Sequence, residues 1–134
     1  MLTKIHHAAI ICSDYQRSKH FYHSILGLTI LAEHYRADRD SYKLDLALPD
    51  GGQIELFSFS NSLPRPSYPE ARGLRHLAFC AENIEETKAL FESRGIVFEP
   101  MRIDEYTQKR FVFFSDPDGL PLELYEERRK NSSE

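Results

Sequence analysis

The feature that most constrains this chain is a nine-residue phrase that occurs twice. Residues 49–57 read Pro-Asp-Gly-Gly-Gln-Ile-Glu-Leu-Phe, and residues 117–125 read Pro-Asp-Gly-Leu-Pro-Leu-Glu-Leu-Tyr. Each phrase begins with turn-forming residues and continues as an apolar strand that carries one carboxylate, Glu55 or Glu123. Because a carboxylate inside an apolar strand is costly unless another group pairs with it, each glutamate is expected to have a specific partner.

A histidine at the head of another apolar strand precedes each of these glutamates. His7 is followed by Ala-Ala-Ile-Ile, and His76 is followed by Leu-Ala-Phe-Cys. Glu55 lies 48 residues after His7, and Glu123 lies 47 residues after His76. Such matched spacing is typical of a tandem duplication whose two halves each bring one histidine and one glutamate to a common place.

The length of the chain allows one compact domain made of two small modules that share a core. It has 134 residues, of which 41% are hydrophobic. We therefore expect a single domain over residues 1–130, with a first module at about 4–60, a proline-rich link at 61–73 and a second module at about 74–126. The charged, aperiodic residues 127–134 are expected to form a flexible tail.

Both modules show the same predicted order of elements, strand-helix-strand-strand-strand, which defines an α+β fold. In the first module Ser13-Asp14 favours a helix start and Gly27 a helix end. Its predicted elements are a strand at 4–12, a helix at 15–26 and strands at 28–32, 42–48 and 53–59. In the second module they are a strand at 75–80, a helix at 84–94 and strands at 97–101, 110–115 and 122–125.

The repeated residue types favour a metal site over an incidental pair of strand histidines. A single histidine or glutamate in a strand is usually structural, but two imidazoles and two carboxylates that recur in register suit a divalent cation and relieve one another's burial cost. The predicted ligands are His7, Glu55, His76 and Glu123. Four further histidines have no such counterpart and are expected to be structural or solvated: His6, His20, His23 and His34.

Composition argues against several classes of partner. The net charge is −4 and the basic residues are scattered, so we expect neither nucleic-acid nor membrane binding. No run of about 18 apolar residues is present and no signal peptide is evident, so the predicted location is the cytoplasm. In that compartment Cys12 and Cys80 are expected to be reduced core residues.

Longer motifs make the chain resemble the vicinal oxygen chelate superfamily, which includes glyoxalase I, bleomycin and fosfomycin resistance proteins, and extradiol dioxygenases. The motifs are His-Ala-Ala-Ile-Ile-Cys-Ser-Asp at 7–14, Ser-Lys-His-Phe-Tyr at 18–22 and the Asp-Gly-x-x-[Ile/Leu]-Glu-Leu strands at 50–56 and 118–124. The resemblance spans residues 4–126. Within the superfamily the chain is most similar to the small bacterial glyoxalase-I-like proteins of the YaeR type, as residues 73–79 and 106–111 show.

This resemblance implies a fold, a cofactor and a reaction. The two modules would form paired curved mixed sheets around a metal cleft, and the glyoxalase I ligand set falls on His7, Glu55, His76 and Glu123. It implies one divalent ion per site, nickel, zinc or cobalt rather than iron or manganese, with two positions open to adjacent oxygens of a small-molecule substrate. Glu123 would act as the catalytic base of a lyase or isomerase, with Glu55 as its partner. A C2 homodimer with sites between chains is also implied, although a site within one chain remains open.

One departure from glyoxalase I concerns how the substrate is held. Glyoxalase I usually has an arginine that helps to hold glutathione four residues after the first ligand, and this chain has Ile11 there. The segment that contains Tyr106, Lys109 and Arg110 is the predicted substrate-binding segment, with Arg72 and Arg75 as alternatives. A metal-dependent dioxygenase and a non-catalytic protein that sequesters a ligand, like bleomycin resistance proteins, remain alternative functions.

Overall fold

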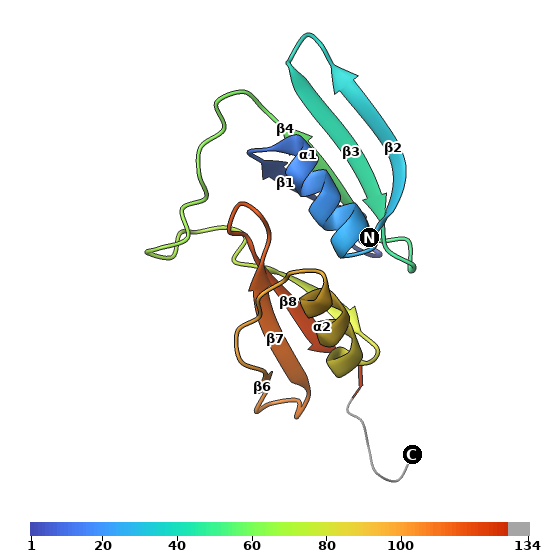
Figure 1. Ribbon diagram of the computed structural model, residues 1–134, viewed down its shortest axis with the longest axis vertical. Coiled ribbons are helices and arrows are strands. Elements are labelled where there is room, and N and C mark those ends of the chain that lie inside the picture. The colour runs from blue at the N-terminus through green and yellow to red at the C-terminus, as the bar shows by residue number, and fades with distance from the viewer. Residues whose placement is uncertain (129–134) are drawn as a thin grey trace. The chain divides into compact units, whose positions relative to one another are not determined.

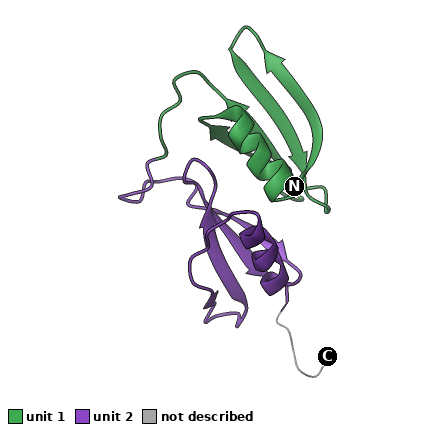
Figure 2. Ribbon diagram, viewed as in Figure 1, with its two compact units in different colours: residues 1–65 green, residues 66–134 purple. Residues whose placement is uncertain are grey.

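The chain folds into two compact units, residues 1–65 and residues 66–134, in a computed structural model that describes residues 1–128 (Figure 2). The division falls inside the predicted link at 61–73. Each unit contains a four-stranded mixed sheet with a helix on it, so the predicted α+β fold of two tandem modules is confirmed. The predicted tail lies outside the described residues from residue 129 onward. None of the helices in the described part is long and apolar enough to span a membrane.

Unit 1 follows the predicted order of elements, and its sheet is ordered β1-β4-β3-β2 (Figure 1). Strand β1 pairs in parallel with β4, whereas the β3–β4 and β2–β3 pairs are antiparallel. The elements are β1 (His7–Cys12), α1 (Tyr15–Lys19), the π-helix η1 (His20–Ile25), β2 (Thr29–Arg36), β3 (Ser41–Ala47) and β4 (Gln53–Ser58).

Unit 2 repeats this arrangement with the strand order β5-β8-β7-β6 (Figure 1). Here β5 pairs in parallel with β8, and the remaining pairs are antiparallel. The elements are β5 (Leu77–Ala81), α2 (Ile84–Ser93), β6 (Arg102–Ile103), β7 (Arg110–Ser115) and β8 (Pro121–Glu126). Because two parallel strands need a crossover connection, each helix returns the chain across its sheet before the sheet is completed.

The hydrophobic core of each unit lies between its helix and one face of its sheet. Alternate strand residues on that face are fully buried, including Leu44 and Leu56 in unit 1 and Val112 and Leu122 in unit 2. The residues of the opposite faces, such as Ile11, remain more accessible within the described chain. Each sheet therefore has a core face, and a second face on which other chemistry can be placed.

The first helix differs from the regular helix predicted at 15–26. It changes from α1 to the wider turn of η1, in which the Leu26 amide donates to the Phe21 carbonyl at 2.9 Å. This turn lets the adjacent residues Phe21 and Tyr22 both be buried in the core. Gly27 ends the helix at φ +84°, as its sequence position predicts.

The strand predicted at Val97–Met101 is wrong, because this segment lies beside α2 without forming a ladder. One backbone hydrogen bond, from the Glu99 amide to the Phe113 carbonyl at 2.9 Å, connects it to β7. Pro100, the next residue, has no amide hydrogen to donate to a neighbouring strand. The Phe98 ring instead packs against the Phe114 ring at 5.0 Å between centroids, and strand pairing begins only at β6.

We expect Asn83→Ala to lower the free energy of unfolding by about 1 kcal/mol, because it removes the N-cap of α2. The Asn83 side-chain oxygen accepts from the Glu86 amide at 3.1 Å. Asn83→Ser keeps an acceptor at the cap and is the matched control. Denaturant unfolding measures the difference, and equal stabilities of the alanine and wild-type proteins would show that the cap contributes nothing.

Candidate functional site

The second unit brings His76 and Glu123 together on the accessible face of its sheet. His76 immediately precedes β5, and Glu123 lies in the middle of β8, where its backbone partner on β5 is Ala78. The His76 Nε2 and Glu123 Oε2 atoms are 2.9 Å apart. Glu123 is only 6% exposed, and the Phe113 ring meets the His76 ring edge-on at 5.0 Å between centroids. Packing and pairing therefore fix both side chains.

The environment of Glu123 favours its neutral form. Burial raises the pKa of this carboxyl above its usual value, and the opposing effects of His76 and Arg102 do not cancel the increase. A cation placed beside the carboxyl would favour its charged form. The electrostatics of the pair thus suit a site that binds a positive ion.

The first unit contains the equivalent pair, His7 and Glu55. The His7 Nε2 and Glu55 Oε2 atoms are 3.5 Å apart. Ala9 on β1 is the backbone partner of Glu55, just as Ala78 on β5 is the partner of Glu123. Each histidine therefore stands two residues before the alanine that faces its glutamate, and the spacing seen in the sequence becomes an identical register in the two sheets.

Each unit supplies two of the four predicted metal ligands. Imidazole nitrogen and carboxylate oxygen fit nickel, cobalt and zinc. Among residues 1–128 no group of three or more His, Cys, Asp or Glu side chains lies close enough together to hold a metal ion. Two protein donors are fewer than metal centres normally use, so the assembly of the full ligand set remains a prediction.

A second histidine accompanies the first pair. The Nδ1 atoms of His6 and His7 are 3.0 Å apart, and the two rings meet edge-on. His6 precedes β1, which begins at residue 7, so strand alternation does not direct its side chain away from His7. Its ring therefore contacts a predicted ligand.

Arg110, a predicted substrate-binding residue, is not on the face that carries Glu123. Val112 and Phe114, which alternate with it along β7, are buried, whereas Phe113 is the residue paired with Glu123. The Arg110 guanidinium instead binds buried Glu126, with Nη2 to Oε2 at 2.7 Å, and also contacts Glu85. Both carboxylates raise the pKa of Arg110. These contacts give Arg110 a structural role.

Lys109 and Tyr106 belong to the turn between β6 and β7. The Lys109 Nζ atom donates to the Glu127 carbonyl at 2.9 Å, and Tyr106 is 89% exposed. The Tyr125 hydroxyl connects this turn to β8, because it donates to Asp104 Oδ2 at 2.9 Å and lies 2.5 Å from Thr107 Oγ1. The structure does not bring Lys109 or Tyr106 into contact with His76 or Glu123 through any hydrogen bond or ion pair among the described residues.

The residue that sequence reasoning missed is Arg102. Its guanidinium carbon lies 4.9 Å from the centroid of the Phe111 ring and 5.4 Å from that of the Phe113 ring. Arg102 is the backbone partner of Phe111, so it shares the sheet face of Glu123. The predicted strand ended at Met101, before the residue that pairs with β7, and this error concealed the position.

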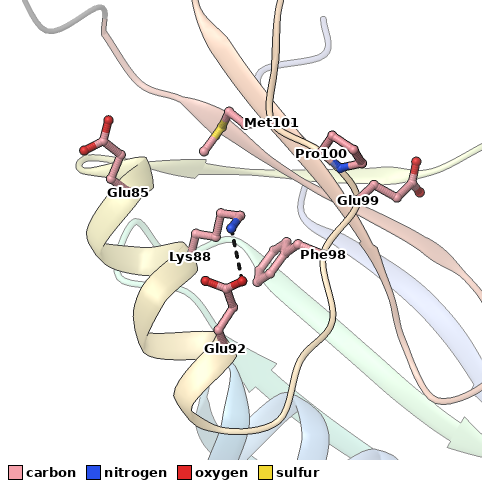
Figure 3. A pocket seen from close by; sticks show the side chains of 7 residues that line it. All are labelled: Glu85, Lys88, Glu92, Phe98, Glu99, Pro100 and Met101. Carbon is pink, nitrogen blue, oxygen red and sulfur yellow. Dashed lines mark hydrogen bonds and ion pairs between the residues drawn. The ribbon is translucent and has the colours of Figure 1, made fainter.

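A separate hollow of about 430 Å³ lies between α2 and the segment 98–101 (Figure 3). Its lysine is already engaged: the Lys88 Nζ atom is 3.1 Å from Glu92 Oε2 and lies over the Phe98 ring. Neither His76 nor Glu123 lines it. The hollow therefore explains how the non-strand segment packs and does not form part of the candidate site.

Comparison with known proteins assigns this chain to a family. Residues 4–124 match the model of the Glyoxalase/Bleomycin resistance protein/Dioxygenase superfamily, and the chain belongs to that superfamily. The uncharacterized protein YaeR of Escherichia coli (strain K12) is 57% identical over 94% of this chain and 98% of its own. The uncharacterized protein YwkD of Bacillus subtilis (strain 168) is 53% identical over 95% and 99%, respectively.

A solved structure and two more distant proteins extend this comparison. The glyoxalase family protein from Enterococcus faecalis has a TM-score of 0.86 and 50% identity, with 92% of this chain and 97% of that chain covered. The lactoylglutathione lyase of Schizosaccharomyces pombe is 25% identical over 90% of this chain and 46% of that protein. The glutathione transferase FosA of Serratia marcescens is 28% identical over 93% and 82%. The more distant relatives thus include a lyase and a transferase.

Arg110→Met is expected to destabilise the protein by about 3 kcal/mol, because it leaves Glu126 buried without its guanidinium partner. The double variant Arg110→Met/Glu126→Gln removes the uncompensated charge and should recover part of the loss. Arg102→Met, at an exposed position, is the matched control and should change stability little. Chemical denaturation provides the measurement. An Arg110→Met protein as stable as the control variant would contradict the structural role.

Proposed function

We propose that His7, Glu55, His76 and Glu123 together bind one divalent cation, and that the protein is a glyoxalase-I-like lyase or isomerase of a small substrate with two adjacent oxygens. The observation that carries this proposal is the pair of His–Glu contacts in identical register on two parallel strand pairs. A duplicated arrangement of two nitrogen and two oxygen donors is difficult to explain by packing alone.

The roles of the residues follow from their surroundings. A nickel, cobalt or zinc ion, when bound, supplies Lewis-acid stabilisation of negative charge on the substrate oxygens. Glu123 is the proposed base that moves a proton between neighbouring carbons, since its side chain is 8% exposed compared with 16% for Glu55. Burial excludes the water that would otherwise compete for the proton. Glu55 is the proposed proton-transfer partner.

The surroundings of the first pair support a substrate other than a glutathione thioester. Ile11 is 55% exposed and alternates with His7 and Ala9 along β1. At this position related glyoxalases use an arginine to hold glutathione. An apolar side chain offers no charge for a glutathione carboxylate, so we propose a smaller substrate.

Glu55→Gln and His76→Ala are each expected to lower metal affinity by more than about 100-fold, since even the loss of an outer-shell partner costs 10- to 100-fold. Both should also abolish the stabilisation that added metal gives to the parent protein. Metal analysis after equilibrium dialysis, combined with thermal unfolding, provides the measurement. Glu92→Gln, outside the candidate site, is the control. Stoichiometric metal at full affinity in either variant would remove that residue from the ligand set.

Oxygen uptake separates isomerisation from the alternative dioxygenase function. The metal-loaded protein is incubated with small hydroxy-ketone, ketoaldehyde and catechol substrates in an oxygen electrode, and products are followed by proton NMR with deuterium in the solvent. We expect solvent exchange or isomerisation without oxygen consumption. Oxygen consumption with an iron-loaded protein would favour the dioxygenase, and tight ligand binding without turnover would favour a sequestering protein.

We further propose that the protein is a C2 homodimer in which each metal site takes one His–Glu pair from each chain. Members of this superfamily are often dimeric, and a pair from a single unit supplies only two donors.

The arrangement can be tested by mixing a His7→Ala chain with a His76→Ala chain. If sites are shared between chains, one of the two sites in the mixed dimer retains all four ligands, so about half of the full metal content should return. If each metal site were formed within a single chain, both sites of the mixed dimer would lack one ligand. Tandem purification on two different tags verifies the mixed dimer before metal analysis, and a monomer at micromolar concentration would exclude the shared arrangement.

A further inference from the structure

Arg102 lies on the same sheet face as the second His–Glu pair. The backbone pairs Arg102–Phe111 and Phe113–Glu123 place the arginine, both rings and the glutamate on one side of the sheet. Figure 1 shows the strands β6, β7 and β8 that carry these residues. The guanidinium rests over both rings, and the Phe113 ring also contacts the His76 ring. An unbroken aromatic surface thus connects the arginine to the candidate site.

Arg102 has no close carboxylate partner within the described chain, although its positive charge acts against the burial that raises the pKa of Glu123. Among residues 1–128 its side chain forms no ion pair within 4.0 Å, and its guanidinium donates no hydrogen bond. The other arginine of this β6–β7 hairpin behaves differently, since Arg110 is bound by Glu126 and Glu85. A guanidinium that lies over aromatic rings can keep its N–H groups available to bind an oxyanion in a bidentate manner.

The residues beside Glu55 in the first sheet can be compared with those beside Glu123 in the second. In the first sheet the residues that correspond to Phe113 and Phe111 are Asp45 and Lys43, because Asp45 pairs with Glu55 and Lys43 with Phe57. There the Lys43 Nζ atom is 2.8 Å from Asp45 Oδ1, so the cation is neutralised internally. In the second sheet two rings replace this ion pair, and the arginine over them has no carboxylate within 4.0 Å among residues 1–128. The first unit also has an arginine over rings, since the Arg36 guanidinium carbon lies 5.2 Å from the Phe57 centroid. Arg36 donates from Nη2 to Ser41 Oγ at 3.0 Å, whereas the Arg102 guanidinium makes no hydrogen bond within residues 1–128.

We propose that Arg102 binds an anionic group, a carboxylate or a phosphate, of the substrate whose reacting oxygens lie beside His76 and Glu123. This inference rests on the proposed function for the location of the reacting oxygens. It makes Arg102 a specificity-determining residue, and it makes the preferred substrate an acid or a phosphorylated compound rather than a neutral hydroxy-ketone.

Binding of three hydroxamates to the Zn²⁺-loaded protein tests the proposal. Acetohydroxamate offers two adjacent oxygens and no further charge, whereas phosphonoacetohydroxamate and malonic monohydroxamate add a phosphonate or a carboxylate. Calorimetry should show that at least one anionic probe binds about 10- to 100-fold more tightly than acetohydroxamate. The anionic probe with the larger gain in affinity shows whether the substrate's anionic group is phosphate-like or carboxylate-like. In Arg102→Met the gain should disappear while acetohydroxamate affinity stays unchanged.

Two further variants sharpen the test. One asks whether binding needs the guanidinium group or only its positive charge, and the other whether the position of the arginine matters. Arg102→Lys keeps the charge but not the planar stack, and should retain only part of the gain. Arg39→Met removes another exposed arginine, in unit 1, and should retain all of the gain. An anionic gain that survives in Arg102→Met, or that Arg39→Met reduces as much, would overturn the proposal.

A sulfate titration followed by NMR keeps this test independent of the metal site. Sulfate should shift the backbone amides of residues 102, 111 and 113 in the parent protein, and these shifts should be absent in Arg102→Met. If acetohydroxamate fails to bind but the sulfate shifts behave as expected, the proposed metal chemistry is wrong and the anion site stands. If acetohydroxamate binds normally but the sulfate shifts are absent or persist in Arg102→Met, the anion site is wrong and the metal chemistry stands.

Discussion

The burial of a carboxylate in the middle of β8 is the constraint on which the second unit depends. Glu123 is almost fully buried, and a charged group there is tolerated only if a partner is supplied. His76 can reach it because β5 runs parallel to β8 in the adjacent position. A parallel neighbour requires a crossover, and α2 provides it while covering the opposite face of the sheet. The pairing of one carboxylate thus determines which face is packed and which is left for chemistry.

Strand alternation separates two buried carboxylates that lie three residues apart. Glu126, on the same strand as Glu123, projects to the helix side, where Arg110 holds it with a guanidinium. Glu123 projects to the other side, where its neighbour is an imidazole that can bind a metal or give up a proton. One carboxylate is therefore permanently neutralised by a cation, whereas the other has a partner that can be shared. The fixed ion pair lies on the opposite face, which leaves Glu123 available for the proposed chemistry.

The duplicated phrase and its paired histidines allowed the fold and the two His–Glu contacts to be predicted, since both depend on short-range patterns. The residues proposed to bind the substrate were harder to predict. Whether Arg110 or Phe111 lies on the sheet face of Glu123 depends on the register between β7 and β8, and a shift of one residue reverses every side chain. No local pattern specifies that register. The π turn at His20–Ile25 arises in the same way, from tertiary packing of Phe21 and Tyr22 rather than from helix propensity.

The two halves keep the same His–Glu register but differ in the residues next to it. Beside Glu55 stands the Lys43–Asp45 ion pair, and beside Glu123 stand two phenylalanine rings with an arginine over them. A site assembled from two identical halves would present the same environment to both ends of a substrate. Divergence at the paired positions of β3 and β7 removes that symmetry while leaving the four donors intact. Under the proposed function, this asymmetry would make a small substrate enter with its two adjacent oxygens in a defined order.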